Sequence, residues 1–203
     1  MSMLSTRAWP LAVAASFAAC RSGSSLVPAH GADAPAAAPR ASVWSLPPVG
    51  LPIAPFHFRL LDGTPLTRDS LLGHPTLLAL WSDDCPSCPA LLAAIDTIQA
   101  LARARTAVLY LVSLDTVASE ASRNLTAVSA RVRIALADGW RDVFIDPWVT
   151  AQHPHQESRV VVPAIIALSA DGSVAFTIPF FDHPRMLESV EVALTMAQRE
   201  RRH

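Results

Sequence analysis

The chain has 203 residues, of which 51% are hydrophobic, and its formal net charge at pH 7 is -1. This length and apolar content suffice for one folded domain with a buried core, and they exclude a chain that is disordered throughout. The near-neutral charge gives no electrostatic reason to expect nucleic acid as a partner. All 16 basic residues are Arg, which excludes mechanisms that need a Lys amine, such as a Schiff base.

The N-terminal residues 1–19 have the pattern of a signal peptide. Arg7 precedes an uncharged apolar run at 11–19 that is too short to span a bilayer as a helix. The segment Phe17-Ala-Ala-Cys20 resembles the lipobox of bacterial lipoproteins, in which a peptidase cuts before a Cys that carries a lipid. We therefore predict export to the periplasmic side and a membrane anchor at Cys20. An ordinary cleaved signal with an incidental Cys is the alternative.

The next segment, residues 20–50, is dominated by Ala, Pro, Ser and Gly and shows almost no periodicity. Such a composition cannot bury enough apolar surface to offset the entropy lost on ordering, so we predict a semi-extended tether. The folded domain is expected to cover residues 51–203. Export places its two remaining cysteines where disulfides form and persist.

The apolar pattern of the domain's first half predicts strands alternating with helices. A strand is expected over 56–61, a helical turn over 66–72, and buried strands over 76–81 and 107–114, with a helix over 85–104 between the buried strands. Strand, helix and strand in this order require a parallel strand pair.

The second half of the domain is less regular. Residues 117–136 favour a helix at first and a strand near the end, and 144–147 look like a strand end. A β-hairpin over 160–178 and a final helix over 184–202 complete a small α/β domain.

Two cysteines at a C-x-x-C spacing, Cys85 and Cys88, stand where the buried strand gives way to the helix. Pro86 is at a position where helices accept proline, and the free N–H groups of a first turn stabilise a thiolate. Cys85 is thus the expected nucleophile and Cys88 the resolving thiol. Pro89 is expected to kink the first turn slightly.

A strand ending in Leu80-Trp81, the C-P-x-C motif, and Val162-Pro163 followed by Asp171-Gly172 resemble the redoxin branch of the thioredoxin superfamily. Among its members, the TlpA/ResA-like exported thiol-disulfide oxidoreductases are most similar. The resemblance covers about residues 51–202. It implies a single thioredoxin-like domain with a central mixed sheet flanked by helices, and no cofactor or metal.

The resemblance also implies residue roles and partners. Cys85 would attack, Cys88 would resolve, and Pro163 would be a cis-proline packed beside the disulfide. Val162 would lend its backbone to a bound client strand, and Trp81 is the aromatic residue that ends the central strand. The expected function is reduction of disulfides in client proteins, for instance in cytochrome c or metal-site maturation, with re-reduction by a membrane thiol carrier.

The chain departs from the family at several positions. Asp84 stands where an aromatic residue usually precedes the first Cys, and Ala79 and Leu91 stand where relatives carry an acid. Asp83 or Asp84 could be the base for Cys88, or both could be solvated charges at a helix start. We predict that Asp84 makes the couple more reducing by raising the thiol pKa through like-charge repulsion.

Parts of the sequence also suggest four other interpretations. A peroxiredoxin-type peroxidase would need Pro at position 78, which is Leu, although Ser82 fits its motif. A copper site similar to that of SCO proteins would use His153 and His155, but those proteins space their cysteines C-x-x-x-C. A disulfide with a purely structural role would contribute little stability at this position, because Cys85 and Cys88 close a very short loop. A degenerate redoxin domain that only binds a partner is the fourth possibility.

Overall fold

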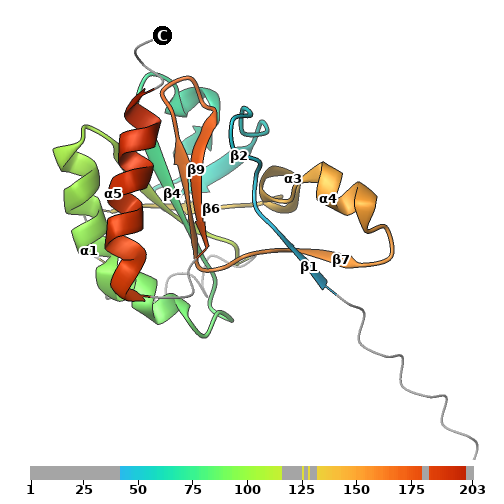
Figure 1. The fold of residues 1–203 in the computed structure, drawn as a ribbon. Helices are drawn as coiled ribbons and strands as arrows, with labels where there is room; N and C mark the ends of the chain where they lie inside the picture. Colours follow the sequence, from blue (N-terminus) through green and yellow to red (C-terminus); the bar gives the residue numbers. More distant parts are fainter. Residues whose placement is uncertain (1–41, 116–124, 126–127, 129–131, 180–182, 200–203) are drawn as a thin grey trace, which may run out of the picture. The chain divides into compact units, whose positions relative to one another are not determined.

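The computed structural model describes residues 42–115, 125, 128, 132–179 and 183–199 (Figure 1), all within the compact unit of residues 39–203. The expected signal peptide, Cys20, most of the tether and the helix expected after residue 117 lie outside the described residues. Within them, no helix is long and apolar enough to cross a membrane.

A seven-stranded mixed sheet with the order β3-β2-β6-β5-β4-β8-β9 forms the centre of the described domain. β4, β5 and β6 are parallel to one another, whereas the outer strands pair in antiparallel fashion. The helix α1 (Cys88–Ala104) connects β4 to β5, which confirms the expected parallel pair. The bounds of the strands are β2 His57–Leu60, β3 Pro65–Thr67, β4 Thr76–Trp81, β5 Val108–Ser113, β6 Arg133–Leu136, β8 Ala164–Leu168 and β9 Val174–Pro179.

The central strand β4 is buried on both faces, as its continuous apolar run predicts. Alternate residues such as Leu77 and Trp81 face the core that α1 and the C-terminal helix α5 (His183–Arg199) cover together on one side of the sheet (Figure 1). The intervening Leu78 faces a second core on the opposite side, with Phe58. Each buried Leu contributes roughly 1.5–3 kcal/mol, so β4 anchors the sheet from both sides.

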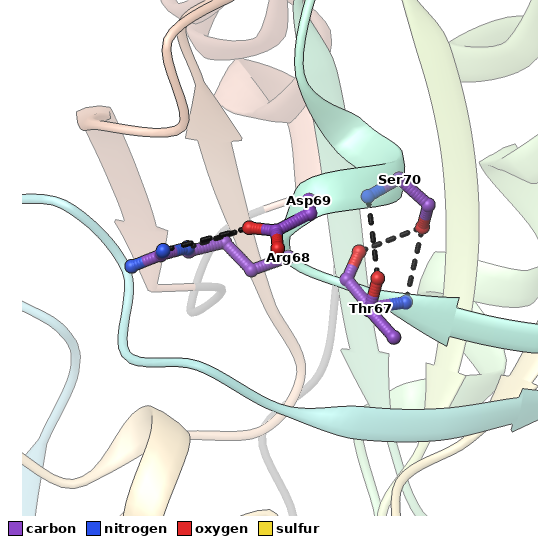
Figure 2. Close-up of polar contacts among 4 residues, drawn as sticks. All are labelled: Thr67, Arg68, Asp69 and Ser70. Carbon is purple, nitrogen blue, oxygen red and sulfur yellow. Dashed lines mark hydrogen bonds and ion pairs between the residues drawn. The ribbon is translucent and has the colours of Figure 1, made fainter.

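The edge hairpin of β2 and β3 leads into a 3-10 turn, η1 (Asp69–Leu71), rather than into the longer helical turn expected over 66–72. Figure 2 shows how the turn is closed: the Ser70 amide donates to the Thr67 hydroxyl and the Thr67 amide to the Ser70 hydroxyl, at 3.3 and 3.0 Å. Arg68 forms an ion pair with Asp69 beside it. The first part of the expected helical turn is a strand because it pairs with β2.

Residues 42–50 are not part of a tether, contrary to the prediction. β1 (Ser42–Ser45) pairs in parallel with β7 (Glu157–Val160), and the Gly50 amide donates to the carbonyl of Val174 at 2.8 Å. The composition of this segment provides no core of its own, but a partner strand distant in sequence satisfies its backbone groups.

Residues 144–147, expected as a strand end, join two short helices instead: α3 (Arg141–Phe144) and α4 (Pro147–Gln152). The Asp146 side chain caps α4 by accepting the Trp148 amide at 2.8 Å, and Pro147 occupies the first turn, where no N–H is needed. The β8–β9 hairpin and α5 are confirmed, but the hairpin begins at Ala164, because Val160 ends β7 and pairs with β1.

Candidate active site

The C-x-x-C motif lies in the loop between β4 and α1, but the helix begins later than expected. α1 starts at Cys88 with Ser87 as its N-cap residue, and Cys85 lies in a preceding turn closed by a hydrogen bond from the Cys88 amide to the Cys85 carbonyl at 3.2 Å. Pro89 rather than Pro86 therefore occupies the first helical turn, where proline costs no hydrogen bond. This position removes the reason for the kink expected at Pro89.

Cys85 and Cys88 form a disulfide with their Cα atoms 5.3 Å apart. The two residues differ in access, because Cys85 is 7% exposed and Cys88 only 2%. Both side chains are therefore buried, and Cys85 is the more accessible of the two. The roles of attacking and resolving thiol stay a prediction.

The peptide bond between Val162 and Pro163 is cis, as the family resemblance implies. Val162 packs against both hydrophobic cores, one of which also contains the two cysteines, and the packing of Pro163 beside the disulfide stays a prediction. Trp81 is buried at the end of β4, and its indole N–H has no hydrogen-bond partner among the described residues.

A cavity of about 470 Å³ opens beside the disulfide. Asp83 lines it together with both cysteines, whereas Asp84 does not. Asp96 of α1 also lines the cavity, and sequence reasoning missed it. The available signal was helical spacing, because Cys88, Leu92 and Asp96 are four residues apart and share one face of α1.

The loop that carries Cys85 is attached to the end of β5. Asp115 accepts the backbone amide of Asp83 on both carboxylate oxygens, at 3.1 and 3.3 Å, and the Ser113 hydroxyl donates to the same carboxylate at 2.9 Å. The sequence indicated only a strand end at Asp115, because the partner of its carboxylate is distant in the chain.

The described residues contain no group of three or more His, Cys, Asp or Glu side chains that could hold a metal ion. His153 and His155 are exposed beyond the end of α4, and no described histidine lines the cavity of the cysteines. The described residues therefore do not assemble the ligand set that the copper alternative needs, two thiolates and a histidine.

The strand order, the C-x-x-C pair after β4 and the cis-proline before β8 define a thioredoxin-like fold, which confirms the fold class expected from the resemblance. No protein-family model and no curated protein matches the sequence. Solved structures do match.

A candidate protein disulfide isomerase from Bacteroides thetaiotaomicron has a TM-score of 0.59 and 14% identity, over 75% of this chain and 94% of that one. A candidate thiol:disulfide interchange protein DsbE from Chlorobium tepidum has a TM-score of 0.54 and 17% identity, over 74% and 99%. ScoI from Bradyrhizobium japonicum, with copper bound, has a TM-score of 0.50 and 18% identity, over 73% and 100%. At these identities the similarity establishes the fold.

Proposed function

We propose that the protein is an exported thiol-disulfide oxidoreductase that reduces disulfides of client proteins. The observation that carries this proposal is the Cys85–Cys88 disulfide at an open cavity, with Cys85 the more exposed of the two. The thioredoxin-like fold and the cis-proline at Pro163 support it. A disulfide that served only stability would have no need of a cavity or of unequal exposure.

The reaction transfers two electrons from the dithiol to the client. The Cys85 thiolate attacks one sulfur of the client disulfide, which forms a mixed disulfide and releases the other client sulfur as a thiolate. Cys88 loses its proton and attacks the sulfur of Cys85. This step forms the Cys85–Cys88 disulfide and releases the second client thiol, and a membrane dithiol carrier restores the pair.

The neighbouring residues take separate parts in this scheme. Asp83 shares the cavity of Cys88, so we assign it the role of proton acceptor for the resolving step. Asp84 precedes Cys85 and does not line that cavity, so its role is to make the couple more reducing by like-charge repulsion. Val162 offers its backbone to the client strand.

Localisation is a separate part of the proposal. Cleavage after residue 19 and lipidation of Cys20 would hold the domain at the periplasmic side of a membrane through residues 20–41. Mass spectrometry of the mature N-terminus tests this part directly. A mature chain with an unmodified Cys20 would contradict the anchor without affecting the redox chemistry.

The redox function is tested by trapping with the Cys88→Ser variant. Without the resolving thiol, mixed disulfides between Cys85 and client proteins should accumulate on non-reducing gels, and their mass spectra identify the clients. The matched control is Cys85→Ser, which lacks the attacking thiol and should trap none. Equal trapping by both variants, or none by either, would contradict the proposal and favour a domain that only binds its partner.

A further inference from the structure

A second cavity, of about 400 Å³, lies beside the active-site loop and is distinct from the one that holds the cysteines. Ser82 and Asp84 of the loop line it, and so does Val162 before the cis-proline. Its remaining walls come from β1, β7, the end of β5 and the start of α3. We call it the β7 groove.

The β7 groove follows β7 to the active-site loop. Glu157, Arg159, Val160 and Val162 line it together with Ser82 and Asp84, and Asp84 directly precedes Cys85. β7 is extended from Glu157 to Val160, which covers about 10 Å at roughly 3.3 Å per residue, and Val162 lies two residues farther along the chain. A client segment of about five residues would match this wall, with its end at Val162 nearest the active-site loop.

Two indole rings form the apolar part of the groove. Trp44 of β1 lies opposite Arg159 in the parallel β1–β7 pair and is 59% exposed. Trp140 is half-buried, and Leu114 and Val160 contribute further apolar surface. An indole exposed to this degree beside a groove is typical of a binding surface, because tryptophan supplies a large and rigid contact area.

Charge is distributed unequally along the groove. At the end distant from the cysteines, the Arg159 and Arg141 guanidinium groups share the single carboxylate of Glu157, at 3.1 and 3.9 Å. Arg141 also lies 4.8 Å from the centre of the Trp140 ring. Two cations and one anion leave this end positive. The end next to Cys85 carries Asp84, an exposed carboxylate, and is negative.

We propose that the β7 groove selects the client: it binds an extended segment with a basic residue beside its cysteine, an apolar or aromatic residue in the middle, and an acidic residue about five positions from the cysteine. The proposal rests on the proposed redox function and deepens it. Charge complementarity at both ends of the groove and its continuity with Val162 favour this occupant. The charged ends of the groove bind the oppositely charged residues of the client segment, and Trp44 and Trp140 contact its apolar side chain.

Reporter peptides test the groove. Each peptide has one cysteine in a mixed disulfide with thionitrobenzoate, so attack by Cys85 on the peptide sulfur releases coloured thionitrobenzoate. The matched peptide has the proposed pattern, and in the reversed peptide the basic and the acidic residue exchange places. Each peptide is made in two orientations, one with the recognition segment before the cysteine and one with the segment after it. The protein is the full reduced chain with Cys20→Ser. We expect the matched peptide, in one of its two orientations, to react about fivefold faster than its reversed counterpart.

Variants separate the groove from the chemistry. Trp44→Ala should slow the matched peptide about five- to tenfold but leave the reaction with dithionitrobenzoate unchanged. Trp148→Ala is the control, because this tryptophan is 68% exposed but lies outside the groove. Arg159→Glu should reduce the preference for the matched peptide or reverse it.

The outcomes for the two proposals are distinguishable. Equal rates for matched and reversed peptides in both orientations, together with an unchanged rate for Trp44→Ala, would overturn the groove while the redox function stood. A wild-type chain that releases no thionitrobenzoate from any disulfide would overturn both.

Discussion

The carboxylate of Asp115 accepts the backbone amide of Asp83 at 3.1 and 3.3 Å, and so attaches the loop of the redox pair to the end of β5. The Ser113 hydroxyl donates to that carboxylate at 2.9 Å and accepts the Asp115 amide at 3.2 Å. The end of β5 therefore positions the loop that carries Cys85, in addition to pairing with β4 in the sheet.

Removal of this attachment should affect stability and reactivity together. We expect Asp115→Ala to lower the free energy of unfolding by about 1–2 kcal/mol, because a charged acceptor of two partners is lost. Urea denaturation measures this loss, and thionitrobenzoate release measures the slower attack by Cys85. Asp115→Asn keeps one acceptor oxygen and should lie between the wild type and the Ala variant. An Ala variant as stable as the wild type would contradict the role.

Asp84 should affect the reduction potential. If its carboxylate opposes the Cys85 thiolate, Asp84→Asn makes the couple less reducing, by roughly 10–20 mV for an exposed charge. Titration against glutathione buffers measures the shift. Glu188→Gln on α5 is the control, because it removes an exposed acid from a helix that lines neither cavity. No shift, or a shift to a more negative potential, would rule out this role.

Asp83 should affect the resolving step instead. Asp83→Asn removes the carboxylate that shares the cavity of Cys88, so release of the mixed disulfide should slow about tenfold at pH 7. The difference should narrow above pH 8.5, where the thiol ionises without help. Stopped-flow decay of a preformed mixed disulfide measures both effects. A loss in Asp96→Asn, with Asp83→Asn unaffected, would transfer the role to Asp96.

The β8–β9 turn should make stability depend on pH. Hydrogen bonds from the hydroxyl and the amide of Ser173 lower the pKa of Asp171 in the folded state. The contribution of the Asp171 carboxylate to the stability of the folded state is therefore complete above the unfolded pKa of about 3.9. It is lost as the pH falls through the lower pKa of the folded state.

Asp171→Ala should thus be less stable than the wild type by about 1 kcal/mol at pH 7. The difference should shrink towards pH 2, as thermal unfolding across this range would show. Asp171→Asn keeps an acceptor and should lose less at pH 7. A difference between Ala and wild type that is constant with pH would show that the charge of Asp171 plays no part.

Local patterns determined the elements that depend on near neighbours. The apolar run of β4 predicted a strand buried on both faces, helical spacing predicted most of α1, and the turn at Asp171-Gly172 predicted the β8–β9 hairpin. The C-x-x-C spacing is also local, since one turn of chain brings Cys88 to Cys85.

Contacts between distant parts of the chain decided the rest. Ser42–Ser45 is a strand only because β7 pairs with it, and the junction of the two short helices is held by the Asp146 amide, which donates to the distant Ser45 hydroxyl at 2.9 Å. Adjacent acids in the sequence, Asp83 and Asp84, line different cavities. Sequence alone thus indicated which pair of cysteines would carry out the proposed redox chemistry, because that depends on residue type and short spacing. Only the tertiary structure decided which acid shares the cavity of Cys88 and which walls form the β7 groove, because both depend on how separate segments pack.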